Sequence, residues 1–328
     1  MNLCNRHFLK LLDFAPAELE LLVQTCLTLK RLRAAGQERP TLATRDLAIG
    51  FEQESQELRW MAQVAVSSVG LRPHYFGPGQ TGFGEGDSIP CKSRQIGRLF
   101  GALVLFGLAQ ERVEEIARTS GVPVINLGST EFQPIPTLAD LATIAEASAR
   151  PLPELSLTFL GDGTSSLAKS LMVGASKLGL DLRICGPKSM HPDLNLTETC
   201  LALGSETGAQ IRLFTEPDQA VKGADFVYSH SWQLEGETDF EKRVETLLPY
   251  RATSSLLSQS GHNRCRLLHR LPVLLNEETA LGSQVTERFQ VDGLEVSREL
   301  FESSANVCFE QAENQLYCCK AVLTSILG

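Results

Sequence analysis

The residues of this sequence best suited to catalysis are two acidic side chains, two histidines and one arginine, each at the end of a predicted strand or in the loop that follows it. They are Glu57, His230, Glu235, His269 and Arg270. Imidazole titrates near neutral pH and burial shifts the pKa of carboxylates, so such a set could act in general acid–base catalysis. The alternative is that these side chains face solvent or pair with one another, as most polar loop residues do. The residue types alone leave both possibilities open.

A glycine-rich turn, Gly161-Asp-Gly-Thr-Ser-Ser166, lies between a predicted strand and a predicted helix, where backbone amides could hold an anion. It lacks the third glycine of a dinucleotide-binding fingerprint and the Gly-Lys-Ser/Thr of a P-loop, which argues against a nucleotide site. No His/Cys/Asp/Glu cluster in the sequence has metal-ligand spacing, so we expect neither a metal nor another cofactor. The nine cysteines are scattered and form no CxxC pair, which is typical of reduced thiols in a cytoplasmic protein.

Helical and strand-like segments alternate along the chain, which is typical of α/β folds with parallel sheets. We expect strands over residues 46–51, 72–76, 102–106, 122–126, 155–160, 181–185, 211–214, 224–229 and 266–269. A long helix over 137–149 leads into Pro151-Leu-Pro153, the predicted domain boundary, and the tail over 303–327 reads as one helical stretch. The sequence therefore predicts two doubly wound parallel-sheet domains joined by inter-domain helices. Such an arrangement places a ligand cleft at the carboxyl ends of the strands.

Length, charge and hydropathy exclude several function classes. A chain of 328 residues is long enough for two domains with separate cores. Thirty basic residues against 39 acidic ones give a net charge of −9, so nucleic acid is not an expected partner. The longest apolar run, Leu99 to Ala109, is too short to cross a bilayer, and the first residues lack the pattern of a secretory leader. We expect a cytoplasmic protein with a small-molecule ligand.

Several segments, taken in order, resemble the ornithine carbamoyltransferase family over nearly the whole chain. They are Phe51-Glu-Gln-Glu-Ser-Gln-Glu-Leu-Arg59, residues 122–126, residues 131–141, Leu160-Gly-Asp-Gly163, residues 220–228, Trp232, His269-x-Leu-Pro272 and residues 309–314. The resemblance implies a homotrimer that binds carbamoyl phosphate in its first domain and an amino-acid amine in its second. It also implies that residues 1–150 with 303–328 form the first domain and residues 151–302 the second.

The phosphate-binding segment departs from the family pattern. Ser55 and Arg59 match, Gln56 replaces a hydroxyl residue, and Glu57 stands where the family has a phosphate-gripping arginine. Gln133 replaces the histidine that contacts the carbamoyl oxygen. In a cleft with an effective dielectric near 20, a carboxylate roughly 4 Å from a phosphate costs several kcal/mol. The resemblance in fold is therefore accompanied by a predicted loss of affinity for carbamoyl phosphate.

The amino-acid half departs as well. Ser166 stands for an asparagine that grips the substrate carboxylate, His230 for an aspartate that holds the α-amine, and Arg270 for a cysteine. His269 matches a family residue that neighbours the reacting carbamoyl group. We therefore predict catalytic roles for His230, His269, Arg270 and Glu57, and substrate contacts for Ser55, Gln56, Gln133, Ser166, Glu235 and Leu271.

These departures lead to a hypothesis with two forms and one alternative. The chain has lost the carbamoyl phosphate and ornithine contacts, and it is either an enzyme for a different amino-acid-like substrate or a non-catalytic regulatory or assembly protein. The alternative is a working carbamoyltransferase that acts on an amino-acid amine. Fold resemblance alone does not decide between them.

Overall fold

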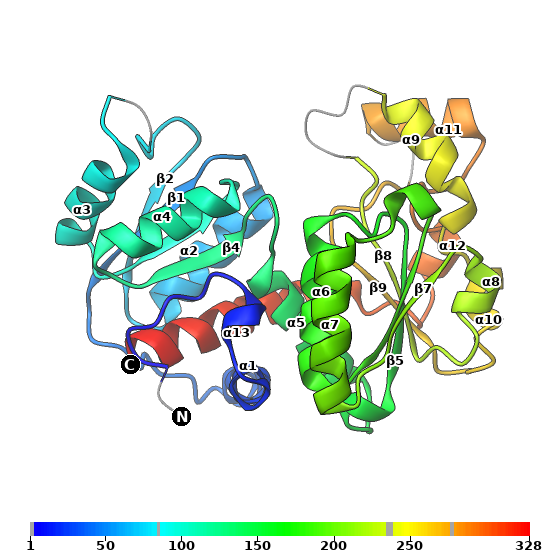
Figure 1. Cartoon of the computed structure of the whole chain (residues 1–328), viewed down its shortest axis with the longest axis horizontal. Helices are drawn as coiled ribbons and strands as arrows, with labels where there is room; N and C mark the ends of the chain where they lie inside the picture. The colour runs from blue at the N-terminus through cyan, green and yellow to red at the C-terminus, as the bar shows by residue number, and fades with distance from the viewer. Residues whose placement is uncertain (1–2, 84–85, 234–238, 276–278) are drawn as a thin grey trace. The chain divides into compact units, whose positions relative to one another are not determined.

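The computed structural model describes residues 3–83, 86–233, 239–275 and 279–328. The chain forms two compact units (Figure 1): unit 1 comprises Met1–Ala142 with Glu313–Gly328, and unit 2 comprises Thr143–Ala312. The two boundaries fall inside helices α5 (Pro134–Ala147) and α13 (Cys308–Leu327). Each unit is built on a parallel sheet, so the predicted α/β class with two parallel-sheet domains is confirmed.

Unit 1 has a four-stranded parallel sheet in the order β2-β1-β3-β4. Its strands are β1 (Asp46–Phe51), β2 (Arg72–Phe76), β3 (Leu103–Phe106) and β4 (Val124–Gly128), and its helices include α1 (Pro16–Ala34), α2 (Gln56–Ser68), α3 (Ile89–Leu99) and α4 (Gln110–Ser120). Strands β1, β3 and β4 are apolar runs because helices cover both faces of a parallel sheet. The chain leaves β1 toward β2 on one side and reaches β3 on the other. The switch point of this sheet therefore lies between β1 and β3.

Unit 2 has a five-stranded parallel sheet in the order β7-β6-β5-β8-β9, with its switch point between β5 and β8. The strands are β5 (Ser156–Leu160), β6 (Asp181–Cys185), β7 (Ile211–Phe214), β8 (Phe226–Ser229) and β9 (Arg266–His269). The helices are α6 (Ser166–Leu178), α7 (Leu194–Thr207), α8 (Pro217–Ala220), α9 (Phe240–Leu247), α10 (Ser254–Ser258), α11 (Ala280–Phe289) and α12 (Arg298–Phe301). Ligands collect at the carboxyl ends of strands next to such switch points, so these two edges are the places to search for a site.

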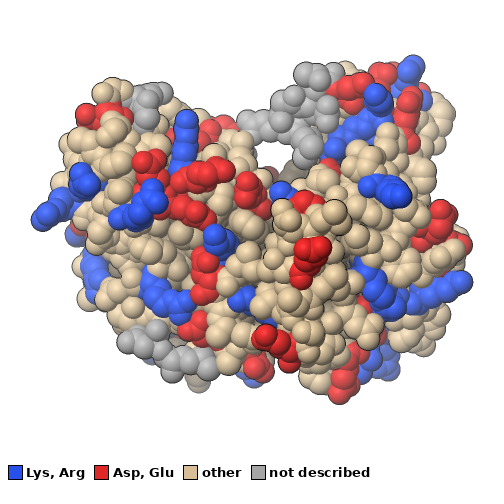
Figure 2. Space-filling model, viewed as in Figure 1, with Lys and Arg blue, Asp and Glu red and all other residues tan. Residues whose placement is uncertain are grey.

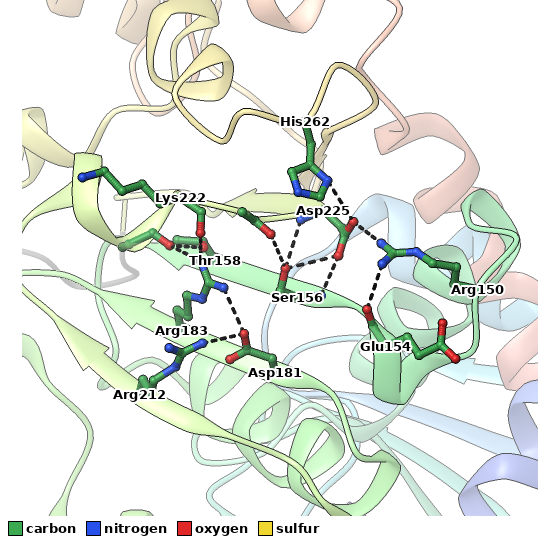
Figure 3. Close-up of polar contacts among 12 residues, drawn as sticks. Arg150, Glu154, Ser156, Thr158, Asp181, Arg183, Arg212, Lys222, Asp225 and His262 are labelled. Carbon is green, nitrogen blue, oxygen red and sulfur yellow. Dashed lines mark hydrogen bonds and ion pairs between the residues drawn. The ribbon is translucent and has the colours of Figure 1, made fainter.

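The opposite, amino-terminal edge of the unit 2 sheet is held by a polar network (Figure 3). Asp225, directly before β8, pairs with Arg150 and accepts a hydrogen bond from the Ser156 backbone N–H at 3.0 Å. Arg183 of β6 donates to the Ala220 carbonyl at 2.9 Å and to the Asp181 carboxylate at 3.0 Å. These partners fix the starts of β5, β6 and β8, so this network serves the scaffold.

The face of the molecule shown in Figure 2 and the described helices show no feature that favours a nucleic-acid or membrane partner. On the face shown in Figure 2, acidic and basic side chains are interspersed, without an extended basic area of the kind that binds a polyanion. Among the described residues, no helix combines the length and the apolar character that crossing a membrane requires.

Candidate functional site

In unit 1, the loops that leave β1 and β3 meet at the switch point of the sheet. Ser55 caps helix α2, and its Oγ accepts a hydrogen bond from the Leu58 N–H at 3.4 Å. Gly107, directly after β3, has a φ of +81°, and a Cβ at this position would lie 2.8 Å from the Gln53 nitrogen. Glycine at 107 therefore allows the two loops to approach closely. The N-terminus of α2 lies beside these two loops, and a helix N-terminus favours the binding of anions.

The predicted phosphate-contacting residues lie around this helix start. Gln56 and Glu57 form the first turn of α2 and are exposed, whereas Gln133 is half-buried directly before α5 and after β4. The Arg59 guanidinium lies over the Tyr75 ring, 4.0 Å from its centroid. Ser55 and Gln133 thus lie on the same edge of the sheet. Because Glu57 is exposed, solvent screens its charge, and its repulsion of an anion is weaker than that of a buried carboxylate.

In unit 2, an arginine from α9 joins the loops that follow β5 and β8. Arg243 contacts the Asp162 carboxylate at 2.6 Å, and each of these two side chains is 10% exposed. The same guanidinium donates to the Trp232 carbonyl at 2.8 Å, and the Trp232 N–H donates to Glu295 Oε1 at 3.0 Å. Burial raises the pKa of the Glu295 carboxyl. Both loops of the switch point are thereby fixed by buried, charge-assisted hydrogen bonds.

His269, the last residue of β9, is fully buried, and neither ring nitrogen has a hydrogen-bond partner among the described residues. Its backbone N–H donates to Gln311 Oε1 at 3.0 Å, which fixes the main chain. Burial lowers the pKa of His269 to about 3, so the ring is neutral at pH 7, with one nitrogen a donor and the other an acceptor. A buried polar atom without a partner costs about 1–3 kcal/mol. The His269 ring therefore has hydrogen-bonding capacity for a bound polar molecule.

His230, in the loop after β8, is half-buried. Its Nδ1 is buried without a partner in the described part of the chain. Burial lowers the pKa of His230 well below its ordinary value, and the positive charge of Arg270 and the neighbouring His269 and Arg243 lower it further. Trp232 Nε1 and Glu295 Oε2 are also buried, and no described residue forms a hydrogen bond with either atom. The carboxyl end of the unit 2 sheet thus concentrates unsatisfied donors and acceptors, which is the pattern of a polar ligand site.

The remaining predicted site residues are Ser166, Arg270, Leu271 and Glu235. Ser166 is the first residue of α6, but Ser165 supplies the cap, accepting a hydrogen bond from the Ala168 N–H at 3.2 Å. Arg270 and Leu271 follow β9 and are half-buried, and Glu235 lies outside the described residues. The groups of three or more His, Cys, Asp or Glu residues that would hold a metal are absent from the described parts of the chain.

Sequence reasoning did not identify Arg243 or Glu295 as residues that organise this edge. Glu295 carried a usable signal, because it is a carboxylate between two apolar residues, Leu294 and Val296. Arg243 carried none, since its partner Asp162 is 81 residues away in the chain.

Comparisons with known proteins were consistent along the whole chain. The family model described as "Aspartate/ornithine carbamoyltransferase, carbamoyl-P binding domain" matches residues 6–146, and the one described as "Asp/Orn binding domain" matches residues 153–326. The catabolic ornithine carbamoyltransferases of Haemophilus influenzae and Chromobacterium violaceum are 36% and 38% identical to the chain, covering 100% of it and 99% of their own lengths. The structure of the ornithine carbamoyltransferase from Pyrococcus furiosus matches with a TM-score of 0.88 and 26% identity, over 100% of this chain and 99% of that one.

These findings correct the main functional hypothesis. A chain that had lost carbamoyl transfer, as a repurposed enzyme or as a non-catalytic protein, was the wrong expectation: relatives 36% and 38% identical over their full length are ornithine carbamoyltransferases. The alternative, a working carbamoyltransferase, is favoured. One physical reason for the error is Glu57. Its repulsion of a phosphate was calculated for a buried carboxylate, whereas the side chain is exposed to solvent.

Proposed function

The chain belongs to the aspartate/ornithine carbamoyltransferase family, and we propose that it transfers the carbamoyl group of carbamoyl phosphate to the side-chain amine of ornithine. The observation that carries this proposal is the full-length match to ornithine carbamoyltransferases at 36% and 38% identity. In this reaction the amine nitrogen bonds to the carbamoyl carbon, the bond from that carbon to the phosphate oxygen breaks, and the amine loses a proton. Following the family pattern, we also propose a homotrimer that works in the cytoplasm.

In the proposed site, residues of the first domain, 1–150 with 303–328, hold carbamoyl phosphate. The phosphate lies at the N-terminus of α2, where Ser55 and Gln56 supply backbone and side-chain donors and the helix dipole favours the anion. Gln133, on the same edge of the sheet, donates its amide N–H to the carbamoyl oxygen. Glu57 weakens phosphate binding, and its exposure keeps that penalty small.

Residues of the second domain, 151–302, hold the amino acid and polarise the carbamoyl group. His269 is neutral at pH 7 and has a ring N–H without a partner among the described residues, so it can stabilise the negative charge that develops on the carbamoyl oxygen. The buried Nδ1 of His230 accepts a hydrogen bond from the attacking amine and orients its lone pair. Arg270 and Ser166 bind the α-carboxylate, and Leu271 contributes an apolar contact to the substrate.

The test is the formation of citrulline from carbamoyl phosphate and ornithine by the purified full-length protein. We expect turnover with ornithine and much slower turnover with aspartate. His269→Ala, which has no side-chain donor, should lower kcat by about 10²–10³-fold, the usual effect of removing one donor to a developing oxyanion. Gln233→Ala is the matched control, because Gln233 is an exposed residue of the loop after β8. Citrulline formation no faster than the uncatalysed rate, with the protein folded, would overturn the proposal.

A further inference from the structure

Unit 1 contains a cavity of about 300 Å³ between helix α3 and the sheet, and its lining includes none of the residues assigned above to the candidate site. Its floor is formed by alternate residues of two strands, Ala48 and Gly50 of β1 and Leu103 and Leu105 of β3. Ile96 and Leu99 of α3 contribute to its lining. Residues i and i+2 of a strand point to the same face, so the cavity lies on the face of the sheet that α3 covers.

The small side chains of β1 create this space. Gly50 has no side chain, and a Cβ there would lie 3.2 Å from Leu105 Cδ2 and 3.3 Å from Thr81 Cγ2. Protein interiors are close-packed, with few voids larger than a water molecule, whereas ligand pockets begin at roughly 300 Å³. Leu99, which lines the cavity, is an apolar side chain that is 69% exposed to solvent. The volume and the lining are those of a pocket for an apolar group.

Three polar side chains of the lining, Gln80, Lys92 and Gln95, have N–H groups that face a ligand as donors. The Gln80 amide oxygen already accepts the Gly77 N–H at 2.9 Å, and the Gln95 amide oxygen accepts from Lys92 Nζ at 3.3 Å. Within the described part of the chain, no residue accepts a hydrogen bond from the two glutamine amide nitrogens, so these groups and the remaining N–H groups of Lys92 can donate to a ligand. Among the described residues, no carboxylate pairs with Lys92. An oxyanion is the complementary group, because it accepts several hydrogen bonds and neutralises the ammonium.

We propose that this cavity binds a monocarboxylate with an unbranched or aryl-alkyl body of about eight carbons. A volume of 300 Å³ accommodates about ten non-hydrogen atoms at roughly 30 Å³ each. The apolar body lies against Leu103, Leu105 and Ile96, and the carboxylate contacts Lys92 and the Gln95 amide N–H. Thr81 takes no part in holding the carboxylate, because its hydroxyl donates to Glu52.

Octanoate, with ten non-hydrogen atoms, is the probe for this proposal. Calorimetric titration of the full-length protein should show saturable binding, and octan-1-ol, which has the same chain without the charge, should bind at least tenfold more weakly. Lys92→Met keeps the aliphatic stem and loses the charge, so we expect it to weaken octanoate binding by about tenfold or more. Arg94→Met is the matched control, because Arg94 is an exposed cation of the same helix outside the lining, and binding should be unchanged.

Two further measurements test the proposal without measuring enzymatic activity. Ala48→Leu places a larger side chain in the floor of the cavity and should abolish octanoate binding. If this variant does not fold, the wild-type protein is used instead, and octanoate should slow the amide hydrogen exchange of α3. Absence of saturable binding overturns the proposal, as does equal binding by Lys92→Met. It is also overturned if α3 exchange slows with protein concentration in the absence of octanoate, because a second copy would then cover the cavity. Failure of the carbamoyl-transfer assay leaves these results unaffected.

Discussion

Replacing Arg243 by methionine should destabilise unit 2 and loosen the loops after β5 and β8. The substitution leaves the Asp162 carboxylate, 10% exposed, without the guanidinium that lies 2.6 Å from it. Breaking a buried ion pair by removing one partner costs about 3–5 kcal/mol. Asp162 keeps hydrogen bonds from the Thr164 N–H at 2.8 Å and the Thr164 hydroxyl at 2.6 Å, which offset part of this cost. We therefore expect a loss near the lower limit, about 3 kcal/mol.

The positions of the two tryptophans allow the unfolding of unit 2 to be measured separately from that of unit 1. The sequence has two tryptophans, Trp60 in unit 1, which is 60% exposed, and Trp232 in unit 2, which is 1% exposed. In a Trp60→Phe background, fluorescence during urea unfolding reports on Trp232, whose carbonyl accepts the Arg243 hydrogen bond. The same preparation gives the KM for ornithine, which should rise because both loops of the switch point lose their common anchor.

A double-mutant cycle with Asp162→Asn distinguishes an ion pair from two independent side chains. The double variant should lose less stability than the sum of the single variants, with a coupling free energy of about 1.5–3 kcal/mol. Arg288→Met is the control, because the pair of Arg288 with Glu241 at 3.2 Å is 61% and 63% exposed and should contribute less than about 1 kcal/mol. Additive losses, or an Arg243→Met effect as small as that of Arg288→Met, would refute the reasoning.

Three further predictions concern Glu57, His269 and Gly107. Glu57→Gln should lower the KM for carbamoyl phosphate about five- to tenfold, because an exposed charge roughly 6–8 Å from a dianion in a water-like dielectric contributes about 1–1.4 kcal/mol; initial rates at low and high salt test this, since salt should remove the difference. The His269 pKa of about 3 lies below the ordinary value of 6.5, so the contribution to stability is present above pH 6.5 and is lost as pH falls toward 3. Between pH 7 and pH 5 that loss is about 2 kcal/mol in urea unfolding, and a His269→Gln variant with the same pH slope would contradict it. Gly107→Ala should destabilise the protein by about 2 kcal/mol in thermal unfolding, because its Cβ would lie 2.8 Å from the Gln53 nitrogen, whereas Gly121→Ala, with no atom within 4 Å of its Cβ, should cost less.

The strands could be predicted from sequence nearly to the residue, whereas some helix ends could not. The strand over 46–51 was predicted with the bounds it has, because an apolar run between polar residues marks a strand covered on both faces. Helix α3 begins at Ile89 because the Ser88 hydroxyl accepts a hydrogen bond from the Cys91 N–H and caps the helix, and this start has no marker in the apolar pattern. The tail was predicted as helical from 303, but α13 begins at Cys308, since the Leu267 N–H donates to the Ala305 carbonyl and holds that segment extended. Such long-range pairing leaves no periodic signal.

The candidate site was predictable in its loops and not in its electrostatics. Strand order places the segments around Ser55, His230 and His269 at carboxyl edges of the sheets whatever their side chains are. The state of each side chain depends on burial, which the sequence does not specify: Glu57 is exposed and its charge is screened, whereas His269 is buried and neutral. The sequence analysis treated the Glu57 carboxylate as if it lay in a low-dielectric cleft, whereas the structure exposes it to solvent. A charge introduced beside an anion weakens binding most where the new side chain is buried, so its exposure has to be known before the repulsion is estimated.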